Sequence, residues 1–181
     1  MGGMALLLHS PVSTAHLLAA LVALITGTAV LYLPKATKGH RRLGWVYVGS
    51  MSVVLLTAFR IYTLFGRFGI VHWGAVGSTG ALLLGVGAVA GRAVVPDWLR
   101  WHYVGMGVSV TSLYATFAVE STYRLFPATY FWWSTLGPGL FVLLLGGWLL
   151  RRHYPAWAAA YSSLREAAPK SLKPTCPSAR G

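Results

Sequence analysis

The stretch KATKGHRRLG, residues 35–44, separates two long apolar runs and contains four lysine or arginine residues and one histidine, His40. Each flanking run is long enough to cross a bilayer, which takes roughly 20 residues of helix. A basic segment between two such runs is typical of a loop on the cytoplasmic side of a membrane. The stretch therefore predicts a helical membrane protein and orients its first two spans.

The composition of the whole chain agrees with this interpretation. Of the 181 residues, 56% are hydrophobic and only 10% are charged, whereas soluble domains carry about 25% charged residues. The formal net charge is +12, but the lysines and arginines lie in short segments between apolar runs and in a tail. This distribution argues against a nucleic-acid-binding module, which needs a basic face on a soluble fold, and is typical of a membrane protein with one basic side.

Five segments are long and apolar enough to cross a hydrocarbon core about 30 Å thick. We expect an all-α, polytopic bundle, preceded by a short segment (1–12) and followed by a basic cytoplasmic tail (151–181) that is largely disordered. The glycine-rich third segment is expected at the centre of the bundle, because small residues let helices approach closely in lipid. The predicted spans are residues 13–33, 43–64, 70–90, 101–119 and 130–150.

Lysine and arginine are concentrated on one side of this predicted bundle. The opposite side has only Arg67 and Arg124. Because basic loops are retained in the cytoplasm, the N-terminus is predicted outside and the C-terminus inside, with anionic lipids as partners of the basic first loop. The sole cysteine, Cys176, falls in the tail. The basic side carries Lys35, Lys38, Arg41, Arg42, Arg92, Arg100, Arg151, Arg152, Arg165, Lys170, Lys173 and Arg180.

Four polar residues from four different predicted spans fall at the outer side. They are His16, Arg60, His72 and Glu120. An ionisable group inside a membrane-spanning helix is costly and usually faces a partner or a cavity. Arg60 and Glu120 are therefore expected to form a structural ion pair. Alternatively, Glu120 joins His16 and His72 in a His-His-carboxylate set, whose ligand types suit zinc or non-haem iron.

A second histidine pair is predicted on the cytoplasmic side. His40 precedes the second span and His102 opens the fourth, with Met106 one turn later on the same helical face. Two histidines from different helices at matched depth are what a six-coordinate haem b needs for its axial positions. The outer pair, His16 with His72, meets the same condition. The alternative for each histidine is a hydrogen bond at the level of the lipid headgroups.

Several of these stretches together resemble a known group of proteins. The first span begins TAHLLAAL (14–21), the junction reads KGHRRLG (38–44), and the fourth span begins WHYVGM (101–106) and ends near Glu120. With His72 at the start of the third span, they resemble an uncharacterised family of predicted bacterial multi-pass membrane proteins, filed as a domain of unknown function. The resemblance covers about residues 14–125 and implies a bacterial plasma membrane location without an activity. The layout is also similar to cytochrome b561-like haem proteins, by analogy only.

The working hypothesis is a redox or metal-binding role. Haem b or a transition metal (zinc, iron or copper) is held by His16 with His72, by His40 with His102, or by both pairs, and a membrane redox partner or a second copy is a candidate partner. One alternative is a cofactor-free protein, either a small transporter or an accessory subunit. Another is a membrane enzyme acting on a lipophilic substrate, with Glu120 as acid or base.

Overall fold

The structure is a computed structural model that describes residues 11–61, 68–122 and 125–167. All regular structure in these residues is helical, and each predicted span falls mainly within one helix. The all-α class is therefore confirmed. The elements are α2 (Pro11–Tyr32), α3 (Lys38–Ala58), α4 (Ile70–Ala90), α5 (Trp98–Thr122), the 3-10 turn η1 (Ala128–Tyr130) and α6 (Phe131–Ala167).

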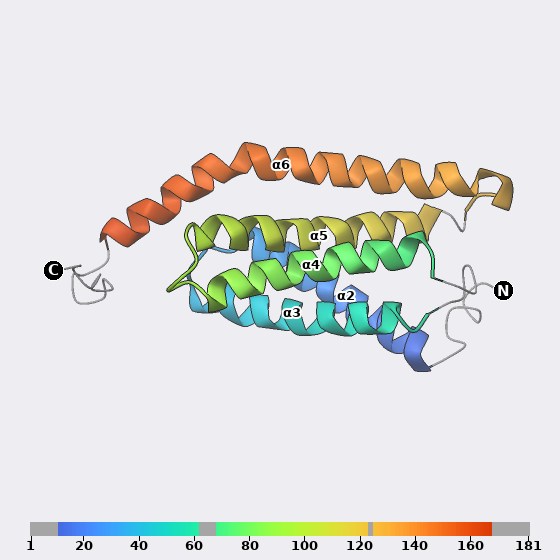
Figure 1. The fold of residues 1–181 in the computed structure, drawn as a ribbon, viewed down its shortest axis with the longest axis horizontal. Helices are drawn as coiled ribbons and strands as arrows, with labels where there is room; N and C mark the ends of the chain where they lie inside the picture. The colour runs from blue at the N-terminus through green and yellow to red at the C-terminus, as the bar shows by residue number, and fades with distance from the viewer. Residues whose placement is uncertain (1–10, 62–67, 123–124, 168–181) are drawn as a thin grey trace.

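Helices α2 to α5 form an up-and-down bundle, and α6 lies along its outside (Figure 1). The most extensive contacts join α2 to α3, α4 to α5 and α5 to α6, while α2 also touches α5 and α3 touches α4. Helix α5 therefore has three neighbours and is the central helix, rather than α4 as expected. The bundle interior holds the apolar side chains of Ala23, Tyr47, Met51, Val54, Leu55, Ala75, Leu82, Val110 and Leu113.

The two ends of the bundle differ in charge. The left end in Figure 1 gathers the ends of α2 and α4 and the starts of α3 and α5. We call it the basic end, because it carries Lys35, Lys38, Arg41, Arg42, Arg92 and Arg100. The opposite end, where α3 and α5 finish, is called the far end.

Helices α4 and α5 meet backbone to backbone at Gly85 and Gly105. A Cβ atom on Gly105 would lie 2.7 Å from the Gly85 Cα and 2.8 Å from the Ala81 carbonyl oxygen. A Cβ atom on Gly85 would lie 2.8 Å from the Met106 backbone nitrogen. Only glycine fits at this crossing. By contrast, a Cβ atom would meet nothing within 4 Å at four other glycines of α4, Gly74, Gly77, Gly80 and Gly87.

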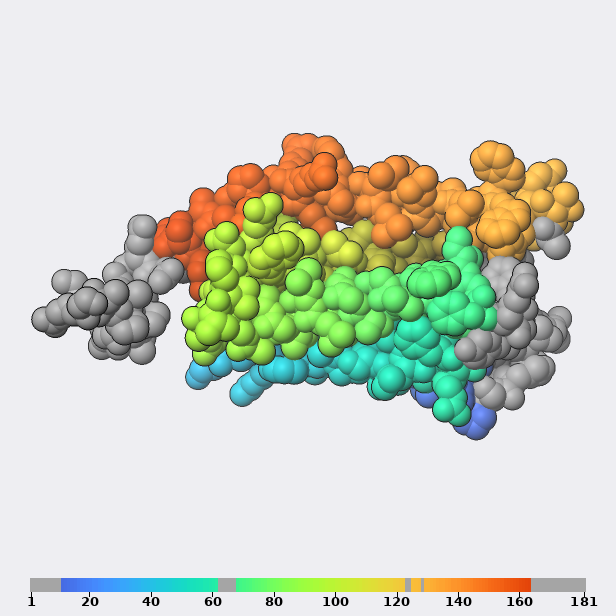
Figure 2. Space-filling model, in the orientation of Figure 1, coloured from blue at the N-terminus to red at the C-terminus, as the bar shows by residue number. Residues whose placement is uncertain are grey.

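Helix α6 packs on α5 through further small residues and continues well beyond the predicted fifth span. A Cβ atom on Gly146 would lie 2.6 Å from the Thr111 hydroxyl oxygen, and one on Gly107 would lie 3.0 Å from the Leu150 Cδ1. Figure 1 shows α6 bending in its C-terminal half, where Pro155 lies within the helix. In the space-filling view α6 forms a separate ridge along the bundle (Figure 2).

The predicted disorder of the tail is wrong for residues 151–167, which are the last part of α6. The physical reason is a set of aromatic contacts that the polar composition of the tail conceals. The Trp157 ring lies 4.8 Å from the ring of Tyr103, and Tyr161 makes an edge contact with Trp98 at 6.1 Å between centroids. These rings hold the helix against the start of α5. Residues 168–181 lie outside the described residues.

Three of the five helices are long and apolar enough to cross a membrane, namely α2, α4 and the Phe131–Ser163 part of α6. This supports the predicted membrane class. Helices α3 and α5 do not meet the same standard over the described residues, since α3 begins with charged residues and α5 carries several hydroxyl groups. All five helices nevertheless expose large apolar side chains on their outward faces, which is compatible with contact with lipid. Examples are Leu18, Ile25, Leu56, Leu83, Phe117 and Phe141.

We predict that Gly105→Ala destabilises the bundle by about 1–3 kcal/mol, the usual cost of overpacking, because the added methyl group meets the backbone of α4. Gly77→Ala is the matched control, since its methyl group enters open space and both changes alter helix propensity alike. Thermal unfolding of the detergent-purified variants, followed by circular dichroism, makes the comparison. Equal midpoints for the two variants would show that the crossing tolerates a side chain.

Candidate functional site

The structure brings His40 and His102 together at the basic end. His40 lies in the first turn of α3 and His102 near the start of α5, and the two imidazoles are close enough to interact electrostatically. The backbone N–H of His40 donates to the Thr37 hydroxyl at 3.2 Å, which caps α3 and positions this first turn. Both rings are also within electrostatic range of Lys35. Three basic groups therefore converge where α2 ends.

Lys35 fixes the end of α2. Its Nζ donates to the carbonyl oxygens of Val30 at 2.7 Å and Leu31 at 2.9 Å, a common way to satisfy the last carbonyls of a helix. Burial lowers the pKa of Lys35, which lies in the loop before α3. The Val30 carbonyl also lies beside the imidazole of His40. The end of α2 thus holds two basic side chains next to one another.

The hydrogen bond of His102 determines which ring nitrogen is open. Its Nδ1 lies 2.9 Å from the carbonyl oxygen of Gly85. A carbonyl only accepts, so Nδ1 carries the hydrogen and the neutral ring presents the lone pair of Nε2. Metal-bound histidines commonly have this arrangement, with the second nitrogen donating to a backbone carbonyl. The Nδ1 of His40 is buried and has no hydrogen-bond partner among the described residues.

Met106 lies at the same crossing. Its side chain covers Gly85, because a Cβ atom on that glycine would lie 2.8 Å from the Met106 sulfur. The glycine contact between α4 and α5 therefore serves two purposes. It brings the Gly85 carbonyl within reach of His102, and it seats Met106 against the same glycine.

At the far end, His16 makes a hydrogen bond that sequence analysis missed. Its Nδ1 lies 2.8 Å from the Thr57 hydroxyl oxygen of α3. Thr57 donates its own hydrogen to the Val53 carbonyl at 2.6 Å, so the hydroxyl oxygen accepts from the Nδ1–H of His16. Glu120, half-buried near the end of α5, lies within electrostatic range of His16. His16, Thr57 and Glu120, from three helices, are called the far-end cluster.

His72 is buried and caps α4. Its ring Nδ1 accepts the backbone N–H of Gly69 at 3.2 Å, and the backbone N–H of His72 donates to the Gly69 carbonyl at 3.0 Å. Because Nδ1 is an acceptor here, the neutral ring carries its hydrogen on Nε2. Among the described residues, no three or more histidine, cysteine, aspartate or glutamate residues come close enough in this structure to hold a metal ion. The metal set of His16, His72 and Glu120 stays a prediction.

Arg60 follows the end of α3 and is exposed. Its backbone N–H donates to the Thr57 carbonyl at 3.0 Å, so the residue continues the last turn of the helix. Glu120 takes part in interactions of its own at the far end. The ion pair between Arg60 and Glu120 stays a prediction.

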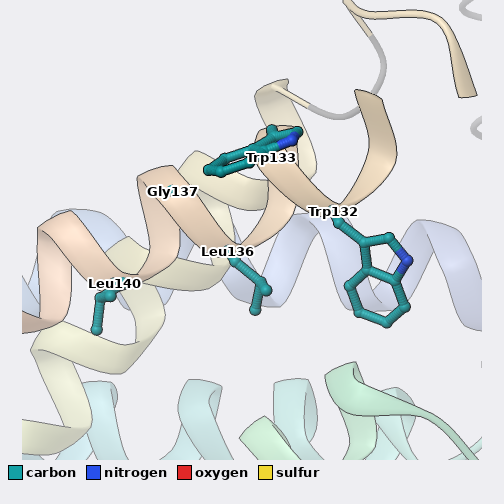
Figure 3. Close-up of a pocket in the computed structure, with 5 residues that line it drawn as sticks. All are labelled: Trp132, Trp133, Leu136, Gly137 and Leu140. Atoms are coloured by element: carbon teal, nitrogen blue, oxygen red, sulfur yellow. The ribbon is translucent and has the colours of Figure 1, made fainter. Parts of the chain in front are cut away.

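Two surface hollows contain none of the predicted site residues. Figure 3 shows the first, an apolar hollow along the start of α6 with Trp132 and Trp133 at one end and Leu140 at the other. The second lies beside α4 and the start of α5. It is lined by Leu83, Leu84, Gly87, Ala88, Val95 and Trp101. The apolar lining of both hollows is compatible with lipid chains.

Comparison with known proteins identifies no relative: no family model, no curated protein and no solved structure matches the chain. The resemblance to the uncharacterised bacterial family therefore stays a prediction. The function has to be argued from the site itself.

The hydrogen bonds predict the tautomers of three neutral histidines. His16 and His102 carry the hydrogen on Nδ1, whereas His72 carries it on Nε2. Nitrogen NMR of the imidazoles in protein labelled with 15N-histidine measures this directly, and single His→Gln variants assign the signals. An Nε2–H signal for His102 would contradict its bond to the Gly85 carbonyl.

Proposed function

We propose that the chain is a multi-pass protein of a bacterial plasma membrane that holds haem b between His40 and His102 and serves a redox reaction. Five helices span the bilayer, with the N-terminus outside and the basic end in the cytoplasm. The observation that carries the proposal is the His40–His102 pair, two imidazoles from two helices within electrostatic range, one of them with Nδ1 tied to a backbone carbonyl.

The donor atoms favour haem over a zinc site. Zinc in proteins usually takes three or four protein ligands, and the basic end offers two imidazoles with Met106 nearby. A porphyrin supplies four nitrogens of its own, so two histidines would be enough to hold its iron. The residues fit this group, because His102 presents Nε2 and His40 has a buried Nδ1 with no hydrogen bond among the described residues. Held there, haem b would supply one-electron transfer between its ferric and ferrous states.

Lys35 suits the same proposal. It lies within electrostatic range of both histidines, and a positive charge beside an imidazole favours the neutral form that a metal requires. A cation here also complements an anionic group, such as the carboxylates of a porphyrin. Lys35 therefore favours the neutral imidazoles that can bind a metal, and it adds a positive charge that can pair with an anionic group of the ligand.

Membrane spanning by α3 and α5 is supported by which residues they bury. Helix α5 buries Ser109 completely but leaves Phe117 52% exposed, and α3 buries Tyr47 while Leu56 is 70% exposed. The hydroxyls of Ser109 and Tyr47 thus lie inside the bundle, and lipid would meet the side chains of Phe117 and Leu56. Polar side chains lower the mean hydropathy of α3 and α5 even where they are buried, so composition alone does not identify these two helices as membrane spans.

We expect protein purified from cells supplied with a haem precursor to show a Soret band, and His102→Gln or His40→Gln to lose it. Glutamine at position 102 keeps a donor for the Gly85 carbonyl, so the helix contact survives. His153→Gln is the control, because His153 is exposed on α6. Absorption spectra, with pyridine haemochrome analysis for haem type, decide the matter. The proposal fails if the wild-type protein has no Soret band or if both variants keep it.

The orientation is tested with the sole cysteine, Cys176, which lies outside the described residues. In intact spheroplasts a membrane-impermeant maleimide should not label it, whereas lysis should allow labelling. The matched variant combines Cys176→Ser with Ser121→Cys, since Ser121 is exposed near the far end of α5 and should react in intact spheroplasts. The reverse pattern would place the basic end outside.

A further inference from the structure

The hollow beside α4 and the start of α5 is open because small residues line its middle. We call it the α4–α5 hollow, and its volume is about 350 Å³, within the range of roughly 300–1,000 Å³ that is usual for ligand sites. A Cβ atom on Gly87 would meet nothing within 4 Å. Figure 2 shows the C-terminal half of α4 uncovered at the left of the view. The lining is apolar and consists of Leu83, Leu84, Gly87, Ala88, Val95 and Trp101.

The α4–α5 hollow lies just inside the basic end. Its deepest lining residue on α4 is Leu83, which is about 10 Å of helix rise from Ala90, where α4 ends. On the other side, Trp101 is the fourth residue of α5 and is 45% exposed. Tryptophan is enriched at the boundary between lipid headgroups and acyl chains. In a bilayer the hollow would therefore meet the upper part of an acyl chain, close to the headgroup.

The loop between α4 and α5, residues 91–97, is held by its own hydrogen bonds. The backbone N–H groups of Val94 and Val95 both donate to the Gly91 carbonyl at 2.9 Å. The Val95 side chain folds back on the end of α4, since a Cβ atom on Gly91 would lie 2.9 Å from its Cγ2. The backbone N–H of Trp101 donates to the Asp97 carbonyl at 3.2 Å. A short, hydrogen-bonded loop therefore connects the two walls of the hollow.

Two exposed arginines flank this loop. Arg92 is the second residue after α4, and Arg100 is the third residue of α5. Asp97, also exposed, is the one acidic residue among residues 91–97, so the two arginines leave this corner of the basic end with a net positive charge. An arginine side chain can lie along apolar surface while its guanidinium reaches the headgroups. The planar guanidinium forms paired hydrogen bonds with a phosphate group.

We propose that the α4–α5 hollow binds an anionic glycerophospholipid. One acyl chain lies against Gly87 and Trp101, and the phosphate pairs with Arg92 and Arg100. The apolar groove takes the chain and the arginines beside it select the charge, the combination by which basic pockets between membrane helices hold anionic headgroups. The lipid contacts both α4 and α5 and so reinforces the central helix pair of the bundle. This site goes beyond the redox proposal and requires no haem.

The experiment uses the full chain in vesicles of phosphatidylcholine that contain a small fraction of phosphatidylglycerol with a diazirine in one acyl chain. After photolysis, mass spectrometry of the peptides measures how strongly residues 83–101 are labelled. A phosphatidylcholine with the same diazirine chain is the reference probe. We expect the anionic probe to label these residues roughly tenfold more than the reference probe, because each arginine near a headgroup strengthens the binding of an anionic lipid severalfold.

Two pairs of arginines separate a local site from general attraction to the basic end. Arg92→Gln combined with Arg100→Gln should lower labelling of residues 83–101 by the anionic probe to the reference level. Arg41→Gln combined with Arg42→Gln is the matched control. These two arginines are also exposed at the basic end, in the first turns of α3, and the double change removes the same charge. The control should keep most of the preference for the anionic probe.

The acyl chain is tested by filling the hollow. Gly87→Leu places a side chain in the space that the lipid would occupy and should lower labelling by the anionic probe severalfold. Gly80→Leu is the matched control, because Gly80 lies two turns earlier on α4, its Cβ would also meet nothing within 4 Å, and it is not part of the lining. Circular dichroism checks that each variant is folded. If Gly87→Leu does not fold, the arginine pairs decide alone.

Three outcomes overturn the lipid site. The first is equal labelling by the two probes in the wild-type protein, which is also the result expected if a second copy of the chain covers the hollow. The second is undiminished labelling in folded Gly87→Leu protein. The third is an equal loss in the two arginine pairs, which would mean that the whole basic end attracts the probe. Absorption spectra of the same preparation separate the proposals: a preference for the anionic probe without a Soret band supports the lipid site and contradicts the haem, and a Soret band without the preference does the opposite.

Discussion

The backbone contact between Gly85 and Gly105 is the constraint on which the rest of the bundle depends. It sets the distance between α4 and α5, the pair that every other helix packs around, and a single methyl group at either position would meet backbone atoms. The same contact brings the Gly85 carbonyl to His102 at 2.9 Å. Helix packing and the position of His102 therefore depend on the same contact. If α4 and α5 lay further apart, the helices would lose their close packing and His102 would lose its hydrogen bond to the Gly85 carbonyl.

Helix α5 buries the hydroxyl of Ser109 among apolar residues such as Val110 and Leu113, and it exposes the large apolar side chain of Phe117. In water, burying Ser109 or Tyr47 would compete with apolar alternatives, whereas in lipid an interhelical hydrogen bond adds about 0.6–2 kcal/mol to an interface that has no hydrophobic driving force. Hydroxyls between helices thus contribute cohesion where aliphatic side chains contribute little. The arrangement that holds the bundle together also places exchangeable hydrogens along its axis.

The sequence predicted the helices well and their contacts poorly, for a physical reason. Apolar runs and basic loops are local signals, so the five segments and the all-α class followed directly. Whether a glycine makes a close contact depends on the neighbouring helix as well as on its own. Gly77 and Gly85 look alike in sequence, yet only Gly85 lies against the backbone of another helix. The Thr57 partner of His16 and the ring contacts that keep residues 151–167 helical are equally non-local. Matched depth predicted that His40 and His102 lie at the same end of the bundle, because depth depends on helix rise alone; their role as ligands stays a prediction.

The two histidine pairs that looked equivalent in sequence differ in their hydrogen bonds. At the far end, His72 uses the lone pair of Nδ1 to cap α4, and His16 donates Nδ1–H to Thr57 beside the Glu120 carboxylate. At this end the Nδ1 atom of each ring therefore holds a helix start or a pair of helices in place. At the basic end, the Nδ1–H of His102 donates to the backbone carbonyl of Gly85, and Lys35 rather than a carboxylate lies within electrostatic range. A carboxylate therefore lies within electrostatic range of His16, and a lysine lies within range of His40 and His102, so the two histidine pairs that share a pattern of depth lie in opposite electrostatic surroundings.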